Sequence, residues 1–285
     1  MNEKILKTKS NGFAALFSIL LLLILSVVGF ISSIALIRNE GLQVVCILLC
    51  ILVFIGSLML FGGLKVVKPQ EAIVLTLFGE YTGSIKEPGF YFVNPFSVAV
   101  NPAAKTKLGQ SGDVDRQSTP VTISTTGGVE ANLNALNKQI SLKIMTLNNS
   151  RQKINDCLGN PVEIGIAVTW RVVDTAKAVF NVDNYKEYLS LQCDSALRNI
   201  VRIYPYDVAP NVDTTGDGIA DEGSLRGSSE VVAKRIRDEI QARVENAGLE
   251  IIEARITYLA YAPEIAAVML QRQQASAIID ARMMI

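Results

Sequence analysis

Two long apolar runs near the start of the chain restrict its architecture more than any other feature. The first covers residues 13–37, the second covers residues 41–64, and neither contains a charged residue. Each run reaches the roughly 20 apolar residues that a membrane-spanning helix needs. Only Arg38, Asn39 and Glu40 separate them. Because lipid tolerates only backbone whose hydrogen bonds are satisfied internally, the sequence predicts a transmembrane helical hairpin over residues 13–64.

The distribution of lysine and arginine around this hairpin indicates its orientation. Arg38 is the only cation of the link, whereas lysines flank both outer ends: Lys4, Lys7, Lys9, Lys65 and Lys68. Since cytoplasmic flanks carry the excess of lysine and arginine, we expect residues 1–12 to be cytoplasmic and the soluble domain to face the cytoplasm from the cell (inner) membrane. A shallow hairpin that returns on the same face gives the same location. The alternative is one true span and an extracytoplasmic domain.

Charge and histidine content exclude several function classes. The chain has 285 residues, a formal net charge of zero and no histidine. The even charge balance gives no reason to expect a nucleic-acid partner. Without histidine the chain lacks the Ser-His and Cys-His nucleophile pairs and the histidine-containing zinc sites. Carboxylate or Ser-Lys chemistry stays open on composition alone, but no motif supports it, so we expect no catalytic, cofactor-binding or metal-binding residues and no enzyme.

The cysteines favour a reducing compartment. They are four in number, with no C-x-x-C pair and no dense spacing, so a disulfide framework is not indicated. We expect buried free thiols at Cys46, Cys50, Cys157 and Cys193.

Short apolar segments after the hairpin predict strands. Residues 71–78 (EAIVLTLF) and 90–93 (FYFV) are rich in β-branched and aromatic residues, with turn residues at 79–83 and at Pro88-Gly89. The alternation of Ile140, Leu142 and Ile144 predicts a further half-buried strand. Residues 155–161 (NDCLGNP) predict a turn.

The clearest strand covers residues 162–172. Six apolar residues in a row share one parity, and the other parity holds Glu163, Thr169 and Arg171. This alternation predicts a strand with one packed face and places the single tryptophan in the core. The six apolar residues are Val162, Ile164, Ile166, Val168, Trp170 and Val172.

Four helices and another strand are predicted after it. Asp174 is placed as the N-cap of a short helix (TAKAVF), and Asp183 as the cap of a longer one that Pro205 ends. The longer helix has a buried stripe at Tyr185, Tyr188, Leu189, Cys193, Ala196, Leu197, Ile200 and Val201. Ser228 or Ser229 starts the next helix, whose buried residues are Ile236, Ile240 and Val244, with Gly248 as its C′ residue. The order of strands, helices, strand (249–257) and a last helix from Pro263 predicts an α+β fold.

Two polar segments interrupt this pattern. Residues 101–138 are rich in Gly, Ser, Thr and Asn and predict a surface excursion, in which disorder and an extra hairpin through residues 121–125 stay open. Residues 207–227 form a Gly- and Asp-rich loop. Its segment from Asp213 resembles part of a calcium loop, because oxygen-bearing side chains and a glycine have the spacing of such a loop. Ser224, however, occupies the position of the bidentate glutamate. We interpret this segment as a solvated turn.

Charged pairs on the helices offer two further candidates. Asp194 and Arg198 are one helical turn apart and are predicted to pair, at a subunit contact or on a solvated face. Arg272, Asp280 and Arg282 either bridge neighbouring terminal helices or lie on a solvated face.

Three long segments resemble one family. VVKPQEAIVLTLFGEYTGSIKEPGFYFVNPF is similar to the opening of the stomatin–prohibitin–flotillin (SPFH, band-seven) domain, and NDCLGNPVEIGIAVTWRVVDTAKAVFNVDNYKEYLSLQCDSALRNIVRIYPYD is similar to its second half. ARITYLAYAPEIAAVMLQRQQASAIIDAR resembles the helix that follows the domain in bacterial members. The resemblance implies an SPFH domain with a mixed or antiparallel sheet and packed helices at 66–260, with 101–138 as an insertion and 207–227 as an expanded loop.

The resemblance also implies a function. Family members are membrane-anchored, form homo- or hetero-oligomeric rings or cages, organise membrane microdomains, and in several cases control the access of a membrane protease to substrates. This implies a scaffold with membrane lipids, copies of itself and a membrane protease as partners. The alternative is a membrane-bound protease or its direct regulatory subunit.

The terminal helix, 262–285, is predicted to mediate oligomerisation. Its apolar residues, Ile265, Val268, Met269, Ile278 and Ile279, are too many for a solitary exposed helix. Small residues at Ala266, Ala267, Ala275, Ala277 and Ala281 let neighbouring backbones approach. We therefore expect coiled-coil-like packing between copies in a closed ring. The alternative is that the helix folds back on its own domain. Relatives have a much longer helix here, so the resemblance leaves the height of a cage open.

Overall fold

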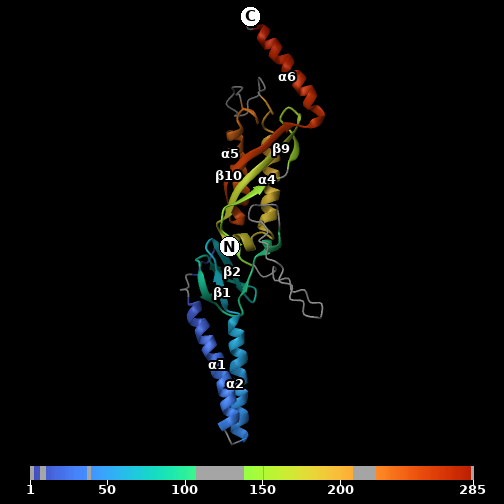
Figure 1. Ribbon diagram of the computed structural model, residues 1–285. Helices are drawn as coiled ribbons and strands as arrows, with labels where there is room; N and C mark the ends of the chain where they lie inside the picture. The colour runs from blue at the N-terminus through green and yellow to red at the C-terminus, as the bar shows by residue number, and fades with distance from the viewer. Residues whose placement is uncertain are drawn as a thin grey trace, which may run out of the picture. The chain divides into compact units, whose positions relative to one another are not determined.

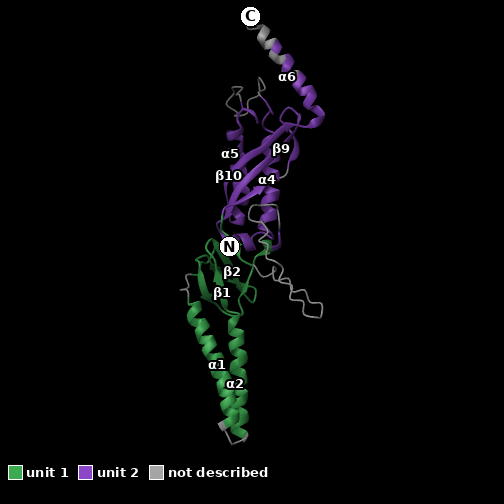
Figure 2. Ribbon diagram, in the orientation of Figure 1, with its two compact units in different colours: residues 1–104, 134–143 green, residues 105–133, 144–285 purple. Residues whose placement is uncertain are grey.

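The computed structural model describes residues 3–6, 11–36, 40–106, 138–149, 151–207 and 223–283. The chain divides into two compact units, which Figure 2 shows in different colours. The first contains residues 1–104 and 134–143, and the second contains residues 105–133 and 144–285. Both units combine helices with antiparallel sheets, as expected for the α+β class.

The first unit begins with two antiparallel helices that lie side by side (Figure 1). They are α1 (Gly12–Leu36) and α2 (Glu40–Phe61), so the predicted helical hairpin is confirmed. The two helices pack closely where α1 has a glycine: a Cβ on Gly29 would lie 3.1 Å from Cys50 Sγ. Small residues at such crossings let apolar helices approach each other in a lipid environment.

The strands of the first unit form two small sheets. In one, β1 (Leu64–Val67) pairs with β4 (Gly89–Phe92). In the other, β2 (Glu71–Leu77) pairs with β3 (Glu80–Ile85) and with two very short strands, β5 (Val98–Ala99) and β6 (Ile140–Ser141). The one-turn 3-10 helix η1 (Pro102–Lys105) follows β5. The buried core of this unit consists of Val67, Ile73, Leu75, Ile85 and Tyr91.

The predicted turn at residues 79–83 is wrong in its extent. The turn is confined to Phe78 and Gly79, because Leu77 already pairs with Glu80. Gly83 lies inside β3 with φ of 153°, and a Cβ there would lie 2.6 Å from a side-chain carbon of Leu6. This glycine therefore permits a close approach of the N-terminal segment to the strand instead of forming a turn.

The second unit is built on the long strand β9 (Pro161–Val172). Strands β7 (Met145–Asn148), β8 (Gln152–Asn155) and β10 (Leu249–Tyr261) all pair with it in antiparallel fashion. The six apolar residues of one parity in β9 are all buried, and Trp170 is completely inaccessible to solvent. The predicted packed face is confirmed, as is the turn between β8 and β9. Strand β10 extends to Tyr261, beyond the predicted 249–257, with two bulges.

The strand predicted from Ile140, Leu142 and Ile144 is wrong. The chain passes from the first unit to the second here, and β6 and β7 belong to different sheets. Ile144 is 59% exposed, whereas Ile140, Met145 and Leu147 are buried. The apparent alternation joins the ends of two short strands across a change of unit.

The described residues of the second unit also form four helices and the 3-10 turn η4. Asp174 caps α3 (Thr175–Phe180) by accepting the Lys177 N–H, as predicted. The cap of α4 (Tyr185–Val201) is Asn184 instead of Asp183: its side-chain oxygen accepts the N–H groups of Lys186 and Glu187. Asp183 lies one residue before the true cap, and its side chain is exposed. Ser228 precedes α5 (Ser229–Val244) without a side-chain cap bond. The 3-10 turn η4 (Glu245–Ala247) follows α5, and α6 (Pro263–Met283) is the last helix.

Gly248 ends the α5–η4 segment as predicted. Its φ is 68°, and a Cβ there would lie 2.3 Å from the Asp174 carbonyl oxygen. Both the left-handed backbone and the close approach require glycine at this position. The Gly248 carbonyl accepts the N–H groups of Val173 and Asp174, which connects the start of β10 to the start of α3.

Candidate membrane anchor and association surfaces

The surface of the hairpin is apolar almost everywhere. Residues Gly12–Ala35 and Gly41–Phe61 are long and apolar enough to cross a membrane, and most of their side chains are exposed in the chain alone. The serines satisfy their hydroxyls within the same helix: Ser26 donates to Leu23 O, Ser33 to Gly29 O and Ser57 to Phe54 O. A helix with no unsatisfied hydroxyl suits a lipid environment. The hairpin is therefore the candidate anchor.

A short segment before α1 is docked on the first unit. Ser84 N–H donates to Lys4 O and Leu6 N–H donates to Ser84 O, both at 2.9 Å, which forms a parallel bridge along β3. Lys86 Nζ lies 2.6 Å from Glu3 Oε2, and both side chains are mostly buried. The residues before the hairpin and the sheet after it therefore lie on the same side of whatever the hairpin crosses.

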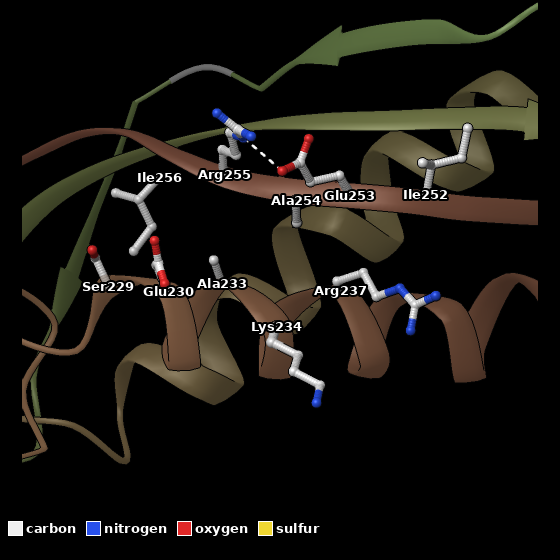
Figure 3. A pocket seen from close by; sticks show the side chains of 10 residues that line it. All are labelled: Ser229, Glu230, Ala233, Lys234, Arg237, Ile252, Glu253, Ala254, Arg255 and Ile256. Atoms are coloured by element: carbon white, nitrogen blue, oxygen red, sulfur yellow. Dashed lines mark hydrogen bonds and ion pairs between the residues drawn. The ribbon is translucent and has the colours of Figure 1, made fainter.

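A groove of about 550 Å³ lies between α5 and β10 in the second unit (Figure 3). Arg237 of α5 donates from Nε to Ile251 O, and Glu253 and Arg255 of β10 pair at 2.6 Å. On its outer side β10 pairs with no other strand in the described part of the chain. The residues that line the groove are Ser229, Glu230, Ala233, Lys234, Arg237, Ile252, Glu253, Ala254, Arg255 and Ile256.

This groove offers charge and shape but no recognisable catalytic set. Its cations and carboxylates are mixed, and the one close pair, Glu253 with Arg255, neutralises itself. Within the described residues no three His, Cys, Asp or Glu side chains are grouped so that they could hold a metal ion. The sequence contains no histidine to activate Ser229.

The thiols outside the hairpin are also unsuited to nucleophilic chemistry. Burial, and then the charge of Asp194, raise the pKa of Cys193 to about 12. Partial burial and the Asp156 carboxylate raise the pKa of Cys157, although its side chain is exposed. Because the thiolate is the reactive form, a raised pKa lowers the reactivity of both groups near neutral pH. The expectation of four buried thiols is wrong for Cys157, and Cys46 and Cys50 are only partly buried.

Helix α6 presents apolar side chains to the outside of the second unit. Val268, Leu270 and Ile278 are 64%, 57% and 56% exposed. Its first turn is connected to the sheet by Glu264, whose carboxylate lies 2.6 Å from Lys153 Nζ and has a lowered pKa because of that bond. In the single chain these side chains are not covered by the rest of the second unit, and the expected packing of the helix against copies of the chain stays a prediction.

The comparison of the sequence with known families decides the classification. The profile described as SPFH domain / Band 7 family matches residues 65–284, which is most of the chain. The chain belongs to the SPFH domain / Band 7 family. The match begins directly after the hairpin and continues through α6. SPFH proteins are generally non-catalytic scaffolds that commonly oligomerise and associate with membranes. No curated protein matches the chain.

The other candidate residues named from the sequence all belong to the second unit, and only some of them lie among the described residues. Asp194 and Arg198 do not pair directly: Asp194 accepts from Asn149 Nδ2 and from Gln152 Nε2, and Arg198 donates to Gln152 Oε1. A glutamine from β8 thus stands between them. The calcium-like loop lies outside the described residues except for buried Ser224, whose hydroxyl accepts the Gly227 N–H. The side chains of Arg272, Asp280 and Arg282 also lie outside the described set.

The polar excursion has its two ends close together. Asn101 Nδ2 donates to Gln139 O at 2.8 Å, and Gln139 Nε2 donates to Val66 O. An excursion whose ends meet is compatible with the predicted insertion at 101–138. Residues 107–137, including the possible hairpin arm at 121–125, lie outside the described residues.

Sequence reasoning missed the docked segment at residues 3–6 and the groove between α5 and β10. A segment of four residues is too short to show a periodicity, and Lys4 is indistinguishable in sequence from an ordinary flanking charge. The groove depends on the packing of α5 against β10. Most of the residues that line it have the polar and charged character of ordinary solvent-facing positions, so the sequence does not distinguish them.

Proposed function

We propose that the chain is a membrane-anchored SPFH scaffold that self-associates and organises the membrane around it. The observation that carries this proposal is the direct succession of an apolar hairpin and a family match over residues 65–284. The proposed division is a cytoplasmic N-terminus at 1–12, a transmembrane hairpin at 13–64, an SPFH domain at 66–260 and an association helix at 262–285. The proposed location is the cell (inner) membrane, with the domain facing the cytoplasm.

The orientation follows from charge. Lysines occupy both outer flanks of the hairpin, whereas its link holds one arginine beside a glutamate. The positive-inside rule then favours the cytoplasm for both flanks. The docked segment supports the same assignment, because Lys4 and Ser84 form one backbone pair and must share a compartment.

Helix α6 supplies the proposed surface for contact between copies. Three large apolar side chains, Val268, Leu270 and Ile278, are more than half exposed. A solitary helix in water is not stabilised by such side chains, whereas a second copy of the same helix would bury them. Exposed Ala266, Ala267 and Ala275 lie among them and permit close approach. A cyclic arrangement buries the same surface on every chain and leaves no open end.

Chemical cross-linking in native membranes tests this surface. In a Cys157→Ser background, which removes the exposed native thiol, cysteine is placed at Val268 on α6 or at Leu191 on α4. Both positions are 64% exposed, so they are equally accessible to a short bismaleimide. We expect chain-to-chain products from position 268 and few from position 191. Absence of products from position 268 contradicts self-association through α6.

A finer part of the proposal is that the assembly controls the access of a membrane protease to its substrates, as the family resemblance implies. The purified chain is expected to show no peptidase activity of its own and to change the activity of a co-reconstituted protease. Peptidase activity that follows the purified chain, and that is lost on changing one of its own side chains, favours the alternative of a membrane-bound enzyme.

A further inference from the structure

Phe78 is the most exposed large apolar side chain in the described part of the chain. It is 90% exposed, and its φ is 49°. With Gly79, at φ of 91°, it forms the two-residue turn between β2 and β3. Turns with positive φ at both positions favour Asn, Asp and Gly, and a bulky residue there is an outlier. The sequence thus places an aromatic ring at an unfavourable position without burying it inside the molecule.

A second exposed phenylalanine stacks on the first. The ring centroids of Phe78 and Phe96 are 6.3 Å apart, with 25° between the planes, and Phe96 is 53% exposed. The loop that carries Phe96 is held in shape by Asn94, whose side-chain oxygen accepts the Phe96 N–H and whose carbonyl accepts the Ser97 N–H. Two separate loops therefore hold one exposed aromatic pair.

The loop of Phe96 lies directly against the end of the second membrane helix. Val93 N–H donates to Gly63 O at 2.9 Å, and Gly63 follows the end of α2 by two residues. A Cβ on Gly63 would lie 2.4 Å from Val93 O, so only glycine permits this approach. Strand β4 is antiparallel to β1, and its end at Phe92 pairs with Leu64. The loop after β4 is thus next to the point where the chain leaves α2.

The strand pairing places Phe78 at the same end of the unit. Thr76 of β2 pairs with Val98 of β5, the strand that follows the Phe96 loop. The other end of β2 begins at Glu71, where it pairs with β6. At about 3.3 Å per residue, a strand the length of β2 separates these two ends by roughly 20 Å. The end that carries Phe78 therefore lies beside the Phe96 loop, whose first residue, Val93, is bonded to Gly63 at the exit of α2. Figure 1 shows the sheet of the first unit next to the ends of α1 and α2.

The size of the aromatic pair favours lipid over a protein partner. A phenylalanine buries about 150–250 Å², so two rings supply far less than the roughly 1,200 Å² of a stable protein interface. Aromatic and aliphatic side chains beside a membrane helix are typical of contacts with the boundary between headgroups and acyl chains. Val98, 51% exposed, and Lys65 continue the same pattern of apolar and cationic residues near the exit of α2.

We propose that Phe78 and Phe96 form a membrane-inserted wedge that enters the boundary of headgroups and acyl chains in the leaflet where α2 ends. This proposal rests on the membrane anchorage in the proposed function. The wedge adds a contact between the SPFH domain and the bilayer that is separate from the two spanning helices. It restricts how the first unit tilts on the membrane surface.

Single tryptophans test the wedge in vesicles whose phosphatidylcholine is brominated on the acyl chains. The only native tryptophan, Trp170, is completely buried in the second unit and provides the baseline emission. Phe78→Trp is compared with Leu52→Trp, in the middle of α2, and with Lys68→Trp, at the opposite end of β2. We expect the brominated lipid to quench most of the emission added at positions 78 and 52 and little of that added at position 68.

The outcomes separate the wedge from the anchor. Quenching at position 52 without quenching at position 78 overturns the wedge and leaves the anchor in place. Quenching at neither position overturns both, and equal quenching at position 68 overturns a wedge localised to one end of β2. A blue-shifted but unquenched tryptophan at position 78 indicates a protein partner and also overturns the proposal. Phe96→Trp repeats the test if Phe78→Trp does not elute like the wild type, with the same expected quenching.

Discussion

The Lys86 ammonium and the Glu3 carboxylate form an ion pair of 2.6 Å that connects the residues before the hairpin to the strand β3 after it. The two side chains are only 21% and 11% exposed, and backbone bonds to Ser84 reinforce the connection. A partly buried pair is less screened by salt than a surface pair. The connection excludes an arrangement in which the membrane separates residues 3–6 from the sheet.

The exposed native thiol at Cys157 provides a direct test of orientation. If the SPFH domain faces the cytoplasm, a membrane-impermeant maleimide should label the chain in opened cells and leave it unlabelled in intact cells. The raised pKa of Cys157 predicts that labelling accelerates as the pH rises through and above the usual range of a thiol. Cys157→Ser is the control and should remove the signal. Labelling of intact cells would place the domain outside the cytoplasm.

Two adjacent residues at the start of α4 should differ in their contribution to stability. Asn184 accepts two backbone N–H groups and donates to Thr106 Oγ1 at 2.6 Å, whereas Asp183 is exposed. Asn184→Ala should lower the free energy of unfolding by about 1 kcal/mol, which is typical of a lost N-cap. Asp183→Ala should change it by only a few tenths. Denaturant titration of the two variants measures the difference, and an equal effect would show that the helix begins elsewhere.

Trp170 should tolerate phenylalanine much better than alanine. Its ring is completely buried and meets Tyr185 edge to face at 6.3 Å between centroids. Trp170→Ala should lower the free energy of unfolding by roughly 3–5 kcal/mol. The indole Nε1 has no hydrogen-bond partner in the structure. Trp170→Phe removes this unsatisfied donor, which offsets part of the free-energy cost of the smaller ring. Denaturant unfolding should separate the two variants. A wild-type emission maximum typical of indole in water would refute the burial itself.

The buried thiol of Cys193 should make stability fall at alkaline pH. Its pKa in the folded chain, about 12, exceeds the ordinary value of 9.0. Below pH 9 the thiol is neutral in both states, and its contribution to stability is fully present. Between about pH 9 and 12 the unfolded chain loses the proton first, so this contribution decreases as the pH rises. The difference in Tm between the wild type and Cys193→Ala should therefore shrink over that range, and a constant difference would contradict the assigned burial.

Regular patterns with one buried face were predictable, whereas interruptions between units were not. The alternation from Val162 to Val172 predicted β9 because one sheet face is packed along its whole length. The same rule failed at Ile144, since periodicity alone does not show that two short strands belong to different sheets. A different rule, that glycine marks a turn, failed at β3, where Gly83 permits the close approach of Leu6 instead.

The candidate surfaces were predictable in kind but not in detail. Charge-free length alone indicated the hairpin, whereas the packing of α6 against copies of the chain, expected from its apolar content, stays a prediction. The pairing of Asp194 with Arg198 was expected from helical spacing, but Gln152 on strand β8 forms hydrogen bonds with both side chains. Phe78 resembled the end of an ordinary strand in sequence, and only its backbone angle and exposure distinguish it.

The mass of the detergent-extracted particle tests the central claim, which is self-association of the SPFH chain through α6. The chain itself has a mass of 31.0 kDa. We expect the wild type to form particles of many chains, and Val268→Glu with Leu270→Glu to reduce them to small species, because these exposed side chains contribute little within the subunit. Gln271→Glu adds charge to the same helix without removing an apolar side chain and should leave the particle intact. A wild-type particle with the mass of one chain after correction for detergent would contradict the scaffold account.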